Sequence, residues 1–209
     1  MKFEKTEVWG FEHAIRGMRN PWESWGKSDS YYGNNEIGLE SYVIGENDLE
    51  LMQKLIKAGS EHRKFLRQIF CSVDITAPLY FFKELDTYKV GTVSNSTSTM
   101  HKLASTPITI DCFEMDDYCG FFEIQWKNLI ALLEQCRKEY NETRDKRYWK
   151  ELIRLLPESW LQKRTITMNY ENILNMYRQR KNHKLTEWSK SFCDWVKNLP
   201  YAEELICLE

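Results

Sequence analysis

Residues 86–101, D-T-Y-K-V-G-T-V-S-N-S-T-S-T-M-H, concentrate hydroxyl side chains in one short stretch. Seven of them are serine or threonine, and the stretch also holds a glycine and an asparagine. Hydroxyls and exposed backbone N–H groups together form an anion cradle, because each donates a hydrogen bond to a phosphate oxygen. Lys89 adds a positive charge. The stretch is therefore either an ordinary surface loop or a loop that holds an anion or a nucleotide.

A second polar group lies in N-Y-E-N-I-L-N-M-Y-R-Q-R-K-N-H, residues 169–183. Its polar residues are Asn169, Asn172, Asn175, Gln179, Arg180 and His183. Asn172, Asn175 and Gln179 are spaced three or four residues apart and therefore share one face of a predicted helix. Asn169 suits the N-cap of that helix, and Arg180 and His183 lie at its end, where cations favour the helix dipole. Each residue alone has a structural explanation, but together they indicate a binding face.

A third candidate is the basic stretch G-S-E-H-R-K-F-L-R, residues 59–67, just before a predicted strand. His62, Arg63 and Arg67 are candidates for binding an anion. Polar and basic helix starts are more often solvated, so we favour an exposed face for this stretch.

Motifs for other kinds of chemistry are missing from the sequence. It contains no nucleotide-binding glycine fingerprint, Walker loop, zinc-protease motif or G-x-S-x-G elbow. Its six cysteines form no C-x-x-C pair and do not cluster with the four histidines, so we predict no metal site. We expect reduced, buried thiols and assign no catalytic residue.

Hydrophobic periodicity predicts the elements that position these residues. Apolar residues recur at helical spacing after Asn47 until Gly59, and Ile69, Cys71, Val73 and Ile75 alternate as in a strand. Pro78 suits the start of a helix that ends near Leu85. Further helices are predicted over 121–140, 146–156, 170–181 and 184–199, and a further strand over 162–169. Residues 1–46 are dense in turn formers, so we expect an irregular segment there. The expected fold class is α/β (α+β), helix-rich, with a small sheet.

The composition predicts one globular domain, residues 1–209, with a core over 47–206. The chain has 209 residues and a formal net charge of −2, so nothing indicates a nucleic-acid or membrane partner. The first residues lack the apolar core of a signal peptide, and no uncharged run reaches the length of a membrane span. We therefore expect a cytoplasmic protein.

Taken together, these stretches resemble the flavin-dependent thymidylate synthase family, over roughly residues 47–206. The signature of that family is Arg-His-Arg-x-x-Ser-x-Asn-Glu-x-Ser-x-Arg-Tyr, one helix after an Ala-Pro pair. Counted from Ala77 and Pro78, it falls on residues 87–100, where Thr87, Tyr88 and Lys89 replace Arg-His-Arg. The stretch R-T-I-T-M-N-Y-E-N-I-L-N-M-Y-R-Q-R-K-N-H resembles the family's second motif. Near the N-terminus, I-R-G-M-R-N-P-W-E-S-W resembles its R-x-x-R-x-S segment and would put Ser24 beside the flavin.

The resemblance implies a homotetramer that binds FAD and dUMP and methylates the nucleotide with methylenetetrahydrofolate and NADPH. The flavin would carry the chemistry, without a cysteine nucleophile. Residues implied at the cofactor are Tyr88, Lys89, Asn169, Asn175 and His183. Residues implied at the nucleotide are Glu84, Thr97, Ser98, Thr99, Arg154 and Arg180.

The replaced signature leaves two alternatives open. Loss of two or three charge-assisted contacts, at about 1.5–3 kcal/mol each, would weaken flavin binding by orders of magnitude. The leading hypothesis is a flavin-dependent enzyme acting on a pyrimidine nucleotide. The alternatives are a non-catalytic relative that binds or sequesters a nucleotide, and a structural protein that keeps only the scaffold.

Overall fold

The alternating apolar residues after residue 68 form a buried strand, as the sequence predicts. The computed structural model describes residues 1–34 and 40–208. In it β4 runs over Phe70–Pro78, and the side chains of Cys71, Val73 and Ile75 on one face are at most 1% exposed. A period of two is the pattern expected of a strand with one face in the core.

Four strands form the larger sheet, in the order β1-β4-β6-β5. The other three are β1 (Lys2–Trp9), β5 (Val93–Ser96) and β6 (Leu161–Asn169). A separate antiparallel pair joins β2 (Tyr31–Asn34) to β3 (Glu40–Val43), with Tyr31 opposite Val43. The sheet is small, and helices make up most of the regular structure, so the predicted fold class is confirmed.

Each helix predicted from the sequence has a counterpart in the structure: α2 (Glu46–Lys57), α3 (Leu79–Leu85), α5 (Glu123–Thr143), α6 (Lys146–Leu155), α7 (Tyr170–Arg180) and α8 (Cys193–Lys197). Three further helices were not predicted, namely α1 (Phe11–Arg19), α4 (Thr99–Lys102) and α9 (Ala202–Leu205). A π-helical turn over Glu187–Phe192 leads into α8. Within the described residues, none of these helices is long and apolar enough to span a bilayer.

The chain divides into two compact units. Unit 1 comprises residues 1–2, 75–87 and 95–165, and unit 2 comprises residues 3–74, 88–94 and 166–209. Each of the four strands of the larger sheet therefore contributes residues to both units. The single domain expected from composition stays a prediction.

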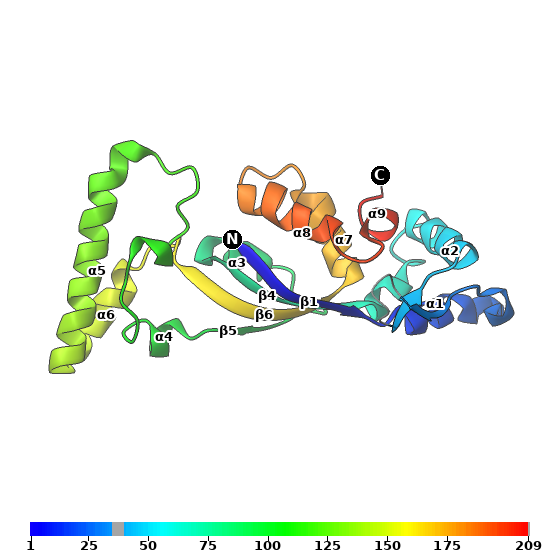
Figure 1. Cartoon of the computed structure of the whole chain (residues 1–209), viewed down its shortest axis with the longest axis horizontal. Helices are drawn as coiled ribbons and strands as arrows, with labels where there is room; N and C mark the ends of the chain where they lie inside the picture. The colour runs from blue at the N-terminus through cyan, green and yellow to red at the C-terminus, as the bar shows by residue number, and fades with distance from the viewer. Residues whose placement is uncertain (35–39, 209) are drawn as a thin grey trace. The chain divides into compact units, whose positions relative to one another are not determined.

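Unit 1 has its core where α5 and α6 pack together (Figure 1). Its fully buried members are Leu103, Ile108, Phe113, Leu133, Cys136 and Leu152. Trp126 and Trp160 pack against them, and the ring of Phe113 lies 5.9 and 5.5 Å from theirs. The core therefore fixes both α4 and the turn that leads to Phe113.

Unit 2 is built around α7, which is buried on the face that carries Tyr170, Ile173 and Leu174. Asn169 caps this helix, because its side chain accepts from the Asn172 N–H at 3.0 Å and Asn172 returns the bond at 3.2 Å. This reciprocal arrangement is a capping box. The predicted N-cap is confirmed.

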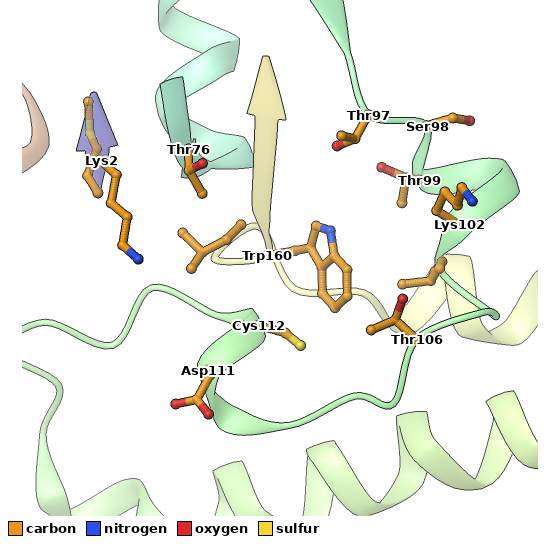
Figure 2. A pocket seen from close by; sticks show the side chains of 13 residues that line it. Lys2, Thr76, Thr97, Ser98, Thr99, Lys102, Thr106, Asp111, Cys112 and Trp160 are labelled. Carbon is orange, nitrogen blue, oxygen red and sulfur yellow. The ribbon is translucent and has the colours of Figure 1, made fainter. Parts of the chain in front are cut away.

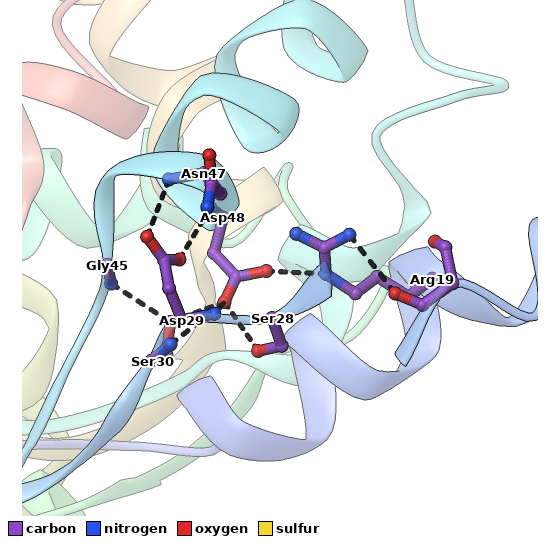
Figure 3. Close-up of polar contacts among 8 residues, drawn as sticks. Arg19, Ser28, Asp29, Ser30, Gly45, Asn47 and Asp48 are labelled. Carbon is purple, nitrogen blue, oxygen red and sulfur yellow. Dashed lines mark hydrogen bonds and ion pairs between the residues drawn. The ribbon is translucent and has the colours of Figure 1, made fainter. Parts of the chain in front are cut away.

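The expectation that residues 1–46 are irregular is wrong. They contain β1, α1, β2, β3 and the first residue of α2, and residues 35–39 lie outside the described part of the chain. The fully buried carboxylate of Asp48, at the start of α2, orders this segment (Figure 3). It accepts from Arg19 Nε and from the Ser28 and Ser30 hydroxyls, each at 2.6 Å. Turn formers here make side-chain contacts to a distant helix, and local composition does not reveal such contacts.

Two other expectations need correction. Residues 86–101 are not a single loop, because they contain β5 and the short helix α4. Residues 59–67 form turns followed by a 3-10 helix, Lys64–Gln68, in place of a helix start, and most of their polar side chains, including His62 and Arg67, are exposed as expected. There the side chain of Arg63 is only 12% exposed. A partner carboxylate, Glu171, accounts for this burial.

Candidate functional site

A cavity of about 340 Å³ in unit 1 is lined by three of the hydroxyl residues of the predicted nucleotide loop. Thr97, Ser98 and Thr99 line it together with Lys102 (Figure 2). Further lining residues are Met1, Lys2, Thr76, Leu103, Thr106, Asp111, Cys112, Trp160 and Leu161. The volume lies within the range of small-molecule sites, about 300–1,000 Å³. Three of the six residues expected at the nucleotide are therefore brought together with a lysine.

Thr97 and Thr99 are held with their hydroxyl protons available. Thr97 Oγ1 accepts from the Lys163 N–H at 3.4 Å, and Thr99 Oγ1 accepts from Gln162 Nε2 at 3.4 Å. A hydroxyl has one proton to donate and two lone pairs. Because the protein satisfies one lone pair of each, the protons can turn toward an anion in the cavity.

Gln162, the donor to Thr99, is itself fixed by a chain of contacts. Its Nε2 also donates to the Thr97 carbonyl at 2.9 Å, and its Oε1 accepts from Arg164 Nε at 2.9 Å. Arg164 in turn donates to Asp86 at 2.8 Å and lies over the Phe82 ring at 4.1 Å. This chain fixes which end of the buried Gln162 amide faces the hydroxyls.

Trp160 lies in the middle of the cavity lining, between the Thr97–Lys102 side and the side of Lys2 and Asp111 (Figure 2). Its ring meets the buried Phe113 edge-on at 5.5 Å, and a backbone bridge also pairs the two residues. An indole held in this way offers a flat apolar surface on which an aromatic base can stack.

The turn Ile110–Cys112 brings Asp111 to the cavity. The segment before it is anchored by Glu134, which accepts from the Ile108 N–H at 2.9 Å and pairs with Arg137. The Arg137 guanidinium and this backbone bond outweigh burial and hold the pKa of Glu134 at about 2. Glu134 is therefore a fixed anion that anchors one wall of the cavity.

Residues 88–94 belong to unit 2, where they lie against α7. The Tyr88 hydroxyl accepts from Arg180 Nε at 3.0 Å and donates to Gln179 at 2.8 Å. The Arg180 guanidinium also lies 5.1 Å from the centre of the buried Trp188 ring. The predicted loop residue and the predicted helix residue therefore contact each other directly.

The same segment contacts the N-terminus of α7. Asn172 Nδ2 donates to the Val90 carbonyl at 2.7 Å. Gly91 has a φ of +76°, and a Cβ at this position would lie 2.8 Å from Asn169 Nδ2. Only glycine combines this backbone conformation with so close an approach. Asn172 and Gln179 therefore share one face of α7, as predicted, and this face binds residues 88–91 through hydrogen bonds.

Asn175 instead joins a partly buried ionic cluster. It accepts from Arg63 Nη2 at 3.1 Å, while Arg63 Nε donates to Glu171 at 3.2 Å and Arg67 pairs with the other oxygen of Glu171. Burial alone would raise the pKa of Glu171, but the two arginines lower it below its ordinary value. This cluster joins α7 to the 3-10 helix.

The other predicted residues lie apart from the cavity. Glu84 lies on α3 and its carbonyl accepts from Thr87, whereas Arg154 lies on α6 and pairs with Glu151. His183 Nδ1 accepts from the Leu185 N–H at 3.2 Å. Neither Glu84 nor Arg154 is among the lining residues, and the roles of all three stay predictions.

Sequence reasoning missed Lys102, Thr106, Asp111 and Trp160, which also line the cavity. Lys102 lies three residues after Thr99 and could have been added to the hydroxyl run. Asp111 and Trp160 could not, because only the packing on Phe113 brings them near.

The cysteine thiols differ in burial, and the free thiol of Cys112 lines the cavity. Burial raises the pKa of the Cys71 thiol to about 12, which makes it unreactive. Of the six free cysteines, Cys119 is exposed, contrary to expectation. Within residues 1–34 and 40–208, no group of three or more His, Cys, Asp or Glu side chains could hold a metal ion.

Comparison with known proteins identifies the fold. No protein-family model matches the sequence, and no curated protein matches it. Among solved structures, the flavin-dependent thymidylate synthase ThyX from Helicobacter pylori, complexed with FAD and dUMP, aligns with a TM-score of 0.74. The alignment covers 100% of both chains at 18% identity. The chain has the fold of a flavin-dependent thymidylate synthase.

A second structure of the Helicobacter pylori thymidylate synthase, also with FAD and dUMP, gives the same TM-score. It aligns over 99% of this chain and 97% of its own at 17% identity. The resemblance read from the sequence is thus confirmed for the fold, and the thymidylate synthase-like fold extends to residues 1–46, beyond the expected core.

Proposed function

We propose that the chain binds a pyrimidine nucleoside monophosphate in the cavity of unit 1. The observation that carries the proposal is the meeting of Thr97, Ser98 and Thr99 with Lys102 in one cavity beside the Trp160 ring. The fold supports it, since the thymidylate synthases that share this fold were solved with dUMP.

In this proposal the phosphate lies at the hydroxyl end of the cavity. The Thr97 and Thr99 protons and the Lys102 ammonium donate to its oxygens, while the base stacks on Trp160. Lys102 is exposed, and no ion pair to it is found within the described residues, so its charge is available to the ligand. Removing one such charge-assisted contact costs about 1.5–3 kcal/mol, or about 10- to 100-fold in affinity.

The residues implied at FAD do not fit a flavin diphosphate in this structure. Tyr88 holds Arg180, Asn169 caps α7, and Asn175 accepts from Arg63. Among the five residues implied at the cofactor (Tyr88, Lys89, Asn169, Asn175 and His183), only Lys89 is an exposed cation. A diphosphate is bound best where several donors carry positive charge. The cofactor therefore stays outside the leading proposal.

Flavin-dependent methylation is the second candidate, because the fold match to an enzyme solved with FAD covers the whole chain. A bound flavin would supply hydride, with methylenetetrahydrofolate as the carbon donor and NADPH as the reductant. A tetrameric assembly and a cytoplasmic location accompany this candidate as predictions. Mass in solution tests the first of these.

The test is a titration of the purified protein with dUMP, followed by calorimetry and thermal unfolding. At 100 times the dissociation constant, binding stabilises the folded state by about 2.7 kcal/mol. Lys102→Ala should weaken binding about 10- to 100-fold, whereas Lys150→Ala, an exposed lysine on α6 outside the cavity, should not. Equal effects of both variants, or no binding of any pyrimidine nucleotide, would contradict the proposal.

The absorption spectrum separates the two candidates. A colourless protein that binds dUMP supports the leading one. A yellow protein with a band near about 450 nm, and NADPH oxidation that depends on dUMP, would instead establish the flavin enzyme.

A further inference from the structure

Unit 1 has a second cavity, which is lined by α5 and by residues 108–118. Its volume is about 550 Å³, and among the described residues it shares no lining residue with the proposed nucleotide cavity. Seven of its ten lining residues are apolar or aromatic, namely Ile108, Ile110, Met115, Tyr118, Trp126, Ile130 and Ala131. The other three are Glu123, Lys127 and Glu134. A mostly apolar cavity of this size is typical of small-molecule sites.

Part of the wall of this second cavity is the core of unit 1. Ile108 is 3% exposed and belongs to that core, and Met115, Trp126 and Ile130 pack against it. The Trp126 ring lies 5.9 Å from the ring of the buried Phe113. Because core packing holds these side chains in place, binding requires little further ordering of them.

The segment 108–118 is fixed by hydrogen bonds, yet it leaves apolar side chains uncovered. The Ile108 N–H donates to Glu134 at 2.9 Å, and the Tyr118 N–H donates to the Met115 carbonyl at 3.3 Å. Ile110 and Tyr118 are nevertheless 44% and 46% exposed. A molecule in the cavity would remove part of this apolar surface from water, which favours binding.

The three charged residues of the lining are all paired within the chain. Glu123 and Lys127 form an ion pair at 2.5 Å. Glu134 accepts from Arg137 with both carboxylate oxygens, at 2.6 and 2.7 Å. The described lining therefore offers no uncompensated charge, and a charged ligand would lose hydration without gaining a counter-ion. Charge complementarity thus favours a neutral ligand.

We infer that this second cavity binds a neutral, planar aromatic molecule. Trp126 and Tyr118 supply rings against which such a molecule packs, and the Met115 thioether makes favourable contacts with ring edges. An apolar cavity of about 150 Å³ binds benzene, so the larger volume here accommodates a molecule of about two or three fused rings. The inference does not depend on the proposed nucleotide binding, which stands or fails separately.

The test uses the purified full-length protein and prodan, a neutral naphthalene whose emission shifts to shorter wavelength in apolar surroundings. Saturable binding of one prodan per chain is expected. The charged comparison is 1-anilinonaphthalene-8-sulfonate, which has the same two-ring core but carries a sulfonate. It should bind at least about tenfold more weakly, because the cavity provides no counter-ion.

Two variants and a control locate the binding. Ala131→Phe places a ring at the cavity from an exposed helix position, so it should weaken prodan binding at least about tenfold while the chain folds normally. Ile110→Ser removes an exposed apolar side chain of the lining and should weaken binding about five- to tenfold. Gln135→Phe is the matched control, because Gln135 is exposed on the same helix but does not line the cavity.

Prodan binding that Ala131→Phe and Ile110→Ser weaken and Gln135→Phe keeps, together with weaker binding of the sulfonate, supports the inference. Unaltered binding in Ala131→Phe overturns it, as do equal losses in Ala131→Phe and Gln135→Phe or a wild type that shows no saturable binding. Sulfonate binding as tight as that of prodan also overturns it, because the ligand need not then be neutral. A dimer detected by sedimentation and abolished by Ala131→Phe overturns it as well, since the cavity would then be an interface between two copies.

Discussion

The Tyr88 hydroxyl accepts a hydrogen bond from Arg180 Nε at 3.0 Å, and the Arg180 guanidinium also lies over the Tyr88 ring. The same hydroxyl donates to Gln179. Tyr88 stands where the resembled signature has its histidine. In this chain the residue at that position binds an arginine of the same unit.

Removing that hydroxyl should loosen the loop without changing its shape. Tyr88→Phe keeps the ring over Arg180 but loses both hydrogen bonds, which predicts a loss of about 1 kcal/mol in the free energy of unfolding. Urea denaturation measures it. Tyr148→Phe, a partly exposed tyrosine on α6, is the control and should change little. Equal stability of the wild type and Tyr88→Phe would show that the contact contributes nothing.

Gln162 should affect nucleotide binding through the hydroxyls that it orients. Gln162→Leu removes the donor to the Thr99 hydroxyl and to the Thr97 carbonyl, so we expect about tenfold weaker dUMP binding. If Gln162→Leu weakened binding only by destabilising the fold, its effect on affinity would not depend on the residue at position 99. The readout is therefore a double-mutant cycle with Thr99→Val, in which the two effects on affinity should not add. Additive effects would contradict a positioning role.

Three glycines separate backbone strain from steric contact. Gly91→Ala combines a φ of +76° with a Cβ 2.8 Å from Asn169 Nδ2, so we expect a loss of about 2–3 kcal/mol. Gly59→Ala has a φ of +111° with open space around it and should lose about 1 kcal/mol. Gly26 has neither feature, so Gly26→Ala should be close to neutral. Unfolding free energies in any other order would be inconsistent with the close packing of Gly91 on α7.

Much of the fold follows from local patterns, whereas the site follows only in part. The alternation around Cys71 and the cap at Asn169 were readable, because both arise from neighbours in sequence. The run of hydroxyls also brings Thr97 and Thr99 to one cavity, and their role at a nucleotide stays a prediction.

Contacts between distant residues account for what the sequence did not reveal. The ordered structure of residues 1–34 depends on Asp48, and the burial of Arg63 depends on Glu171, 108 positions away. Trp160 and Asp111 meet through Phe113. None of these pairings has a signal in periodicity or composition, since a buried ion pair can form only once packing removes water from both groups.

The Asp48 carboxylate should be the most sensitive single polar group of unit 2. It is fully buried and pairs with Arg19, whose side chain is 5% exposed. Asp48→Asn leaves the guanidinium without its counter-charge, and breaking a buried pair from one side costs about 3–5 kcal/mol. Glu50→Gln on the same helix removes only an exposed pair with Lys54 and should cost less than about 0.5 kcal/mol. Chemical denaturation of both variants checks the contrast, which equal losses would refute.

Glu134 predicts how stability depends on pH. The Arg137 guanidinium is the main reason that its folded pKa lies at about 2, below the ordinary value of 4.5. A depressed pKa means that the carboxylate stabilises the fold fully above the unfolded value and loses this contribution as the pH falls from 4.5 toward 2. Glu134→Gln should therefore cost about 2 kcal/mol at neutral pH, and the gap to the wild type should close as the pH falls. Urea denaturation at about pH 7, 5 and 3 measures the gap.

Glu123→Gln is the control, because Glu123 forms an exposed pair with Lys127, and this variant should differ little from the wild type at any pH. A gap for Glu134→Gln that stays constant with pH would mean that its effect on stability is not electrostatic.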